Sequence, residues 1–207
     1  MNKPNLAYRF IKRTFDICAS GLAMILLSWL FAIVAVLIKK DDGGPVIHVR
    51  KCVGYKKKPL DMYKFRTMVI DADNFEKYMS PEILELHLSG DKSFEDPRIT
   101  KIGKKLRSTS LDELPQLMDV FLGKMSLIGP RPVVDREAEA YGDEADILLS
   151  IRPGITGYWQ IYGRKDLPFL SEEAMSQQLY YAKNCSLRLD VKLFFQTIKA
   201  LFIRTGK

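Results

Sequence analysis

The chain has 207 residues and a formal net charge of +7, with 32 Lys and Arg against 25 Asp and Glu. This length supports one core of catalytic size, and the charge favours anionic partners: nucleic acid, anionic lipid or a phosphorylated substrate. Three well-separated cysteines exclude a disulfide framework and a zinc site. The two histidines, His48 and His87, have no ligand-spaced companion, which argues against a His-based metal site or a Ser-His-Asp triad.

An uncharged, mostly apolar segment runs from Ile17 to Ile38 and is long enough to cross the ~30 Å hydrocarbon core as a helix. Lysines and arginines stand on both sides of it, and both flanks therefore favour the cytoplasmic side. A re-entrant helix bent near Ser28 satisfies both flanks, although Trp29 follows where a proline would force the bend. An ordinary single-pass anchor is the alternative. Asp16, at the edge of the segment, is interpreted as a helix-end or interfacial residue.

The rest of the chain alternates short strand-like runs with helical patterns. Residues 46–49 and 60–67 predict a β-hairpin, 90–100 a polar loop, and the spacing elsewhere predicts helices within 74–88, 99–106, 137–150, 171–183 and 187–204. We therefore predict an α+β fold, mostly helical with a small β-hairpin or sheet. The predicted organisation is a membrane helix in residues 1–40 and a cytoplasmic catalytic domain with interfacial helices in 41–207.

The last segment, residues 187–204, combines leucine and phenylalanine with four basic residues. Such a helix suits the headgroup plane of a membrane. Packing on a protein core is the alternative, and the upstream apolar segment makes us favour the interface.

Two adjacent carboxylates, Asp112 and Glu113, follow Ser110 in a helical pattern that ends at Gly123. The spacing from Ser110 to Glu113 is that of a capping box, which is the structural alternative to a catalytic role for Glu113. The start of a helix stabilises Asp112 as an anion, which suits a nucleophile or a metal ligand better than a proton donor.

Five basic residues are candidates for phosphate binding. Arg131 stands between two prolines that limit where its guanidinium can point, and a stiff turn with a solvated arginine is the alternative. Lys64 and Arg66 share one face of the second predicted strand, where a solvated edge is the alternative. Arg152 and Arg164 bracket a stretch rich in glycine and aromatic residues, which permits close backbone approach and stacking.

Six motifs make the chain resemble the monotopic phosphoglycosyl transferases, the small bacterial sugar transferases that prime glycan synthesis on polyprenol phosphate. They are YKFRTM (63–68), DPRITKIG (96–103), RSTSLDELPQ (107–116), MSLIGPRP (125–132), RPGITG (152–157) and GR (163–164). The motifs agree with the family in order and spacing over nearly all of the chain after the apolar segment, and we expect the small, minimal form. One departure is Trp29, because the family often has Ser-Pro at the bend.

The resemblance implies a two-step reaction on the cytoplasmic face of the bacterial inner membrane. Asp112 would attack the sugar-attached phosphate of a UDP-sugar and expel UMP, and polyprenol phosphate, usually undecaprenyl phosphate, would then take the phosphosugar. Glu113 matches the second catalytic position, Arg107 and Arg131 match phosphate-binding positions, and magnesium is the family cofactor, contacted by Asp112. Inner-membrane lipids are further expected partners and nucleic acid is not; the sugar, the pathway and the oligomeric state are not specified.

Two other functions remain open from the residues alone. A membrane-tethered phosphodiesterase or phosphatase could use the same acidic pair without a lipid acceptor. A non-catalytic basic protein that binds lipid or nucleic acid would explain the charge and the anchor, but it gives no role to acids held near arginines.

Overall fold

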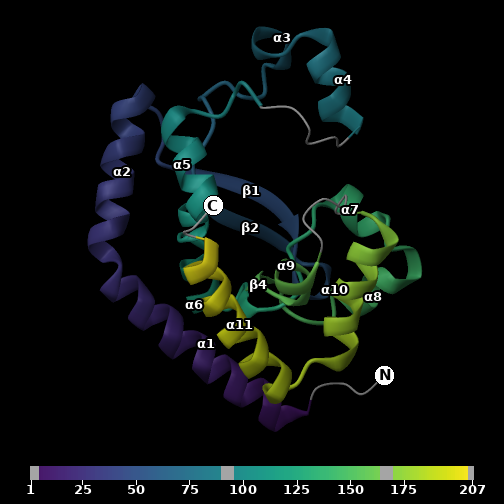
Figure 1. Ribbon diagram of the computed structural model, residues 1–207. Coiled ribbons are helices and arrows are strands. Elements are labelled where there is room, and N and C mark those ends of the chain that lie inside the picture. Colours follow the sequence, from purple (N-terminus) through teal and green to yellow (C-terminus); the bar gives the residue numbers. More distant parts are fainter. Residues whose placement is uncertain (1–4, 90–95, 164–169, 205–207) are drawn as a thin grey trace. The chain divides into compact units, whose positions relative to one another are not determined.

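The computed structural model describes residues 5–89, 96–163 and 170–204. The fold is α+β and mostly helical, as predicted, with two small two-stranded sheets in the described residues (Figure 1). Contacts divide the chain into two compact units. The first unit contains Met1–Leu26, Val49–Tyr63 and Gln116–Lys207, and the second contains Leu27–His48 and Lys64–Pro115. The predicted boundary at residue 40 divides the chain by environment, and it stays a prediction.

The apolar segment forms the end of α1 (Leu6–Leu26) and most of α2 (Ser28–Asp42), which are interrupted at Leu27. The interruption lies beside Ser28, where we expected a bend. No helix in the described ranges is by itself long and apolar enough to cross a bilayer, whereas α1 and α2 pass that test as a pair bent by 61°. Length and composition are thus compatible with a broken span or a re-entrant loop, and the choice between them stays a prediction.

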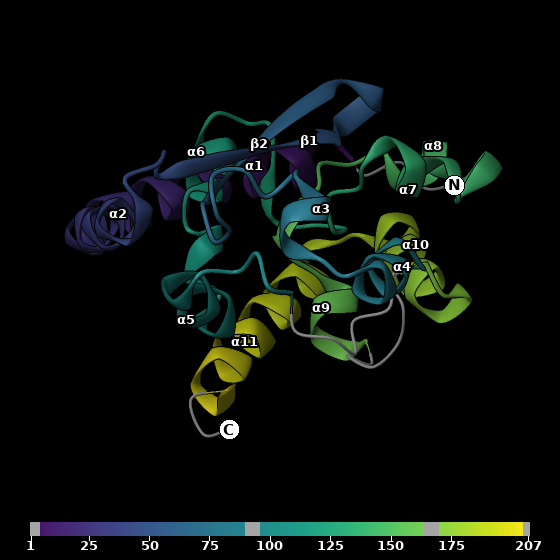
Figure 2. The same cartoon turned by 90° about the horizontal axis from the view of Figure 1, so that it is seen from above.

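The predicted hairpin is present as β1 (Ile47–Val53) and β2 (Pro59–Phe65), joined through the turn η1 (Tyr55–Lys57) (Figure 2). Its first strand extends four residues beyond the predicted run. The turn end of the hairpin belongs to the first unit and its open end to the second.

The second unit also contains α5 (Lys101–Thr109), the turn η2 (Leu111–Glu113), and the short helices α3 (Phe75–Tyr78) and α4 (Pro81–Ser89). Its core is formed by side chains from α2, β2 and α5: Val34, Ile38, Phe65 and Leu106. At Gly103 a Cβ atom would lie 2.0 Å from the carbonyl oxygen of Thr67, so only glycine lets α5 approach the chain after β2.

In the first unit, β3 (Ser126–Ile128) follows α6 (Gln116–Phe121) and pairs in parallel with β4 (Gly154–Thr156), with Ser126 opposite Gly154. The stretch 152–164, expected to be loop-like, therefore contains β4 and also α9 (Tyr158–Tyr162). Our expectation was wrong because glycines suggested a turn, whereas they allow the two strands to approach closely. A Cβ on Gly129 would lie 2.5 Å from the carbonyl oxygen of Arg152.

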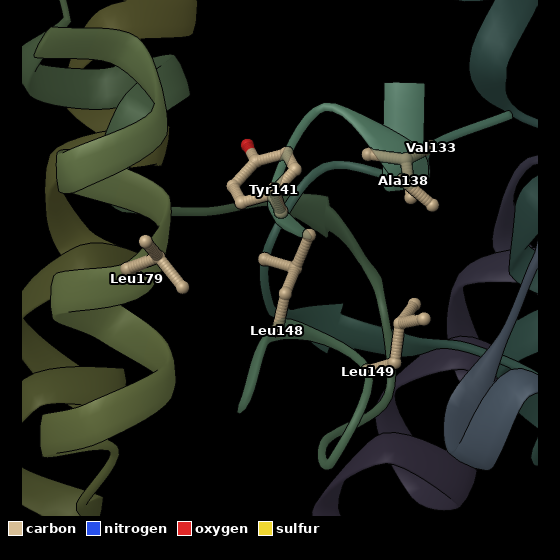
Figure 3. Close-up of a cluster of buried hydrophobic side chains, with 6 residues drawn as sticks. All are labelled: Val133, Ala138, Tyr141, Leu148, Leu149 and Leu179. Atoms are coloured by element: carbon tan, nitrogen blue, oxygen red, sulfur yellow. The ribbon is translucent and has the colours of Figure 1, made fainter. Parts of the chain in front are cut away.

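The acidic stretch predicted as one helix is broken into α7 (Asp135–Glu139), η3 (Gly142–Glu144) and α8 (Ala145–Leu148). The break lies at Gly142, whose φ of +50° cannot continue a right-handed helix. Side chains from α7, from α8 and from residues next to them pack with Leu179 of α10 (Glu172–Asn184), as Figure 3 shows.

The two C-terminal helices were predicted closely. The hydroxyl of Ser171 accepts the N–H of Ala174 and caps α10, and α11 runs from Leu187 to Arg204. In α11 Leu193 is fully buried, whereas Val191 and Phe195 are exposed. This helix therefore has both a core face and an apolar outer face.

Polar contacts from α1 reach residues far along the chain. The carboxylate of Asp16 accepts the N–H of Leu127 at 3.0 Å, and Arg13 donates to the carbonyls of Val120 and Phe121. Asp16 lies inside α1 and is 3 % exposed, so its interpretation as a helix-end residue was wrong, and its depth relative to a membrane stays a prediction. Its buried carboxylate provides the acceptor that the N–H of Leu127 in β3 requires.

Candidate functional site

The acid pair lies on η2, directly after α5. Ser110 ends α5 with a φ of +58°, and its N–H donates to the carbonyl of Arg107. The predicted capping box was wrong, because the side chain of Ser110 makes no capping hydrogen bond and Glu113 bonds elsewhere. The N–H of Glu113, which a capping box would direct to the hydroxyl of Ser110, donates instead to the backbone carbonyl of Ser110 at 3.2 Å.

Lys64, near the end of β2, lies against both carboxylates. Its Nζ is 2.7 Å from Oε1 of Glu113 and 4.0 Å from Oδ2 of Asp112. The side chain of Asp112 is 13 % exposed and that of Glu113 is 35 % exposed. Asp112 is thus the sheltered acid and Glu113 the accessible one, with a single ammonium group between them.

Burial raises the pKa of Asp112 above its ordinary value, and the neighbouring Glu113 adds to the rise. Lys64 and Arg107 oppose it, because their positive charges favour the carboxylate. We had expected the helix start to hold Asp112 as an anion. Asp112 instead lies on a three-residue turn, and burial there raises its pKa. The charge state of Asp112 therefore depends on the cations around it.

Two other predicted phosphate-binding residues belong to the same unit. Arg107 donates its Nε–H to the hydroxyl of Thr67 at 2.9 Å and is exposed at the surface. Arg66 is buried, pairs with Asp42, and donates to the carbonyls of Pro45 and Met68. Arg107 can reach a ligand beside the acid pair. The guanidinium of Arg66 is instead bound by Asp42 and two backbone carbonyls, so the alternative of a solvated edge was wrong for Arg66.

The remaining predicted arginines lie in other parts of the chain. The N–H of Arg131 donates to Oε1 of Gln178 at 2.8 Å, and its Nη1 is 3.5 Å from Oε1 of Glu137. Arg152 donates its Nε–H to the carbonyl of Gly123 and lies over the ring of Tyr55. Both belong to the first unit. Arg164 lies outside the described residues.

The acid pair offers a magnesium ion two adjacent carboxylate groups, those of Asp112 and Glu113. No group of three or more His, Cys, Asp or Glu side chains with metal-binding geometry occurs in the described part of the chain. Mg²⁺ is commonly bound through one or two carboxylates together with waters and substrate phosphates. Adjacent Asp112 and Glu113 fit that shared mode, in which the substrate completes the coordination.

Sequence reasoning missed the structural acids. Asp42 pairs with Arg66, and the fully buried Asp119 accepts the N–H of Tyr63 at 2.9 Å. Neither has a local signature, because their partners lie 24 and 56 residues away. Asp16 did carry a signal: a charged residue at the edge of an apolar segment commonly has a specific partner.

Comparison with known proteins places this geometry in context. The bacterial sugar transferase family matches residues 7–204. The exopolysaccharide production protein ExoY of Rhizobium meliloti is 40 % identical over 198 residues, covering 94 % of this chain and 87 % of that protein. The undecaprenyl-phosphate galactose phosphotransferase of Salmonella typhimurium is 40 % identical over 201 residues, 96 % of this chain and 42 % of that protein.

A third relative is the UDP-glucose:undecaprenyl-phosphate glucose-1-phosphate transferase of Klebsiella pneumoniae, 36 % identical over 93 % of this chain and 40 % of that protein. These matches define the class: the chain is an enzyme, a phosphoglycosyl transferase. The chain belongs to the bacterial sugar transferase family, among the polyprenol-phosphate phosphosugar transferases.

Proposed function

We propose that this enzyme transfers a sugar 1-phosphate from a UDP-sugar to polyprenol phosphate and thereby starts the assembly of a bacterial surface glycan. The observation that carries the proposal is the sheltered Asp112, held with Glu113 around Lys64, in a chain that matches this family from residue 7 to residue 204. The substrate class is supported by the name of the Klebsiella pneumoniae relative, which states both donor and acceptor, and by that of the Salmonella typhimurium relative, which states the acceptor.

In the proposed first step, a carboxylate oxygen of Asp112 attacks the sugar-bearing phosphorus of the UDP-sugar. The bond from that phosphorus to the bridging oxygen breaks, and UMP leaves with the electron pair. A phosphate oxygen of the polyprenol phosphate then attacks the same phosphorus, and the acyl phosphate bond breaks to restore the carboxylate. Covalent capture suits one water-soluble and one lipid substrate, because they can occupy the site in turn.

The charged residues around Asp112 have different proposed roles. A carboxylate that attacks a diphosphate meets repulsion, and the positive charges of Lys64 and Arg107 would offset it. Glu113 is the accessible acid, and we assign it to the acceptor's attack. When bound, Mg²⁺ would supply further positive charge to the phosphoryl oxygens through Asp112 and Glu113. Arg131 is proposed as a phosphate ligand on the strength of the family motif.

Membrane attachment belongs to the same proposal. The broken helix pair α1 and α2 is compatible in length and composition with a re-entrant anchor, and basic flanks on both sides favour the cytoplasmic face. The exposed Val191 and Phe195 of α11 suit contact with headgroups and upper acyl chains. We propose a monotopic protein of the bacterial inner membrane, with its catalytic part on the cytoplasmic face.

The deciding experiment measures UMP release from a panel of UDP-sugars with Mg²⁺ and undecaprenyl phosphate. Intact-protein mass spectrometry without the acceptor should detect a phosphosugar adduct, and peptide mapping should place it on Asp112. Asp112→Asn should lose both the adduct and turnover, because the amide is a poor nucleophile. Asp73→Asn is the matched control, since Asp73 is an exposed acid in the same unit.

Substantial turnover by Asp112→Asn would refute the nucleophile. Steady UMP formation without any lipid acceptor would instead favour a phosphodiesterase. No UMP from any UDP-sugar under these conditions would contradict the proposed reaction.

A further inference from the structure

A cavity of about 550 Å³ in the first unit is lined by an excess of positive charge. All its lining residues belong to that unit, and none comes from the second unit, which contains the acid pair. Six lining side chains are basic and two are acidic: Arg9, Lys12, Arg13, Lys56, Lys57 and Arg152 against Asp16 and Asp146. Neither the acid pair nor the proposed reaction accounts for this arrangement.

Two of the six cations are neutralised by ion pairs. Lys12 pairs with Asp190 at 2.9 Å, and Lys57 with Asp146 at 2.6 Å. The other four form no ion pair within 4.0 Å with any described carboxylate. Their partners are uncharged. Arg9 donates to the hydroxyl of Tyr55, and Lys56 lies over the ring of the same tyrosine. Arg13 and Arg152 each donate to backbone carbonyls.

The guanidinium groups of Arg13 and Arg152 also repel one another, which lowers the pKa of Arg13 in addition to the effect of burial. Like charges held together in a cavity favour a bound anion, and guanidinium groups suit phosphate oxygens in particular.

The turn η1 presents the lysines in a conformation that is costly for them. Lys56 and Lys57 have φ values of +56° and +60°, in the left-handed region that residues with a Cβ seldom adopt. Backbone strain of this kind commonly occurs where function requires it. Here both strained residues line the cavity.

The helix that provides three of the basic residues has an apolar outer surface. Arg9, Arg13 and the other cavity-lining residues of α1 share one face, while Leu6 and Phe10 are 81 % and 73 % exposed. These residues belong to the N-terminal part of α1, before the apolar segment, and an amphipathic helical segment of this kind lies at the headgroup level of a bilayer. A cavity beside it is therefore within reach of lipid phosphates.

We propose that this cavity binds a phosphate ester group, and that the membrane-facing residues of α1 favour a lipid headgroup as its source. This binding is measured without a UDP-sugar, so it stands or falls separately from the proposed reaction. The test compares the affinity of the full-length protein for vesicles of phosphatidylglycerol mixed with phosphatidylcholine, and for vesicles of phosphatidylcholine alone.

The cavity variant is Arg9→Gln with Lys56→Gln, and the matched control is Lys51→Gln with Lys183→Gln, two exposed lysines of the same unit outside the cavity. Both variants lose two positive charges. We expect the cavity variant to lose roughly thirtyfold in affinity for the anionic vesicles, and the control to lose less than threefold. Circular dichroism checks folding, and Lys56→Gln alone, at an exposed position, is the second variant.

A second arm identifies the source of the phosphate. Inorganic phosphate is titrated into the protein in phosphatidylcholine micelles, and the melting temperature is measured. If free phosphate enters the cavity, it should raise the melting temperature of the wild type and not that of the cavity variant. Binding only to anionic vesicles assigns the cavity to a lipid headgroup. Equal losses by the cavity and control variants, or no binding to either probe, would overturn the proposal.

Discussion

The two faces of α11 give a prediction with a worked magnitude. Leu193 is fully buried and packs in a cluster with Ile128 and Tyr181. Leu193→Ala removes that packing and leaves a cavity, which typically costs 2–5 kcal/mol for a buried leucine. At about 3 kcal/mol, and with roughly 2–4 °C per kcal/mol for a chain of this size, the melting temperature in detergent micelles should fall by about 6–12 °C.

Phe195→Ala on the same helix is the contrasting change. Phe195 is 63 % exposed, so the free energy of unfolding should change by no more than about 0.5 kcal/mol. Burying a phenylalanine in an apolar phase is worth roughly 1.5–3 kcal/mol. The exposed share implies a loss of about 1–2 kcal/mol on leaving the bilayer, which is roughly a 5- to 30-fold weaker partition.

Thermal melting and vesicle co-sedimentation of both variants separate these effects. The reasoning is refuted if Leu193→Ala melts within 2 °C of the wild type, or if Phe195→Ala binds vesicles as the wild type does. The first result would show that the Leu193 face of α11 does not stabilise the fold. The second would show that the Phe195 face does not contact the membrane.

Two further predictions concern the second unit. Lys64→Met removes a charge that lowers the pKa of Asp112, so that pKa should rise and the acid limb of the kcat/KM profile should move to higher pH; an unmoved limb would contradict the pairing. Gly103→Ala would place a Cβ 2.0 Å from the carbonyl oxygen of Thr67, and overpacking should cost about 1–3 kcal/mol in urea unfolding. Lys105→Ala, at an exposed site on the same helix, should unfold in urea at the same concentration as the wild type.

Local patterns predicted the elements whose signals are local. The serine cap and acidic first turn of α10 and the bounds of α11 could be predicted because each depends on neighbouring residues. The hairpin of β1 and β2 could also be predicted, since its turn lies between the two runs it joins. The parallel pair β3 and β4 could not, because three-residue strands carry no periodicity and pair across 28 residues.

The site was predicted in part for the same reason. Asp112, Glu113 and Lys64 were chosen as candidates, but their contact depends on β2 meeting η2 across 49 residues. The capping box was a local inference, and the left-handed Ser110 overrode it. The direction of the pKa shift of Asp112 required its burial, which sequence does not state. Arg66 was chosen for its charge, although Asp42 uses that charge within the fold.

The polar contacts of α1 have a consequence for how this enzyme can be engineered. The carboxylate of Asp16 and the guanidinium of Arg13 bond residues 111 and 107 positions later, and Lys12 reaches Asp190. A truncation that starts after residue 40, or an exchange of α1 for a generic anchor, would leave the N–H of Leu127 and the carboxylate of Asp190 without these partners. The helix α1 is therefore part of the folded first unit. A soluble variant has to retain the polar residues of α1 and replace only its exposed apolar residues.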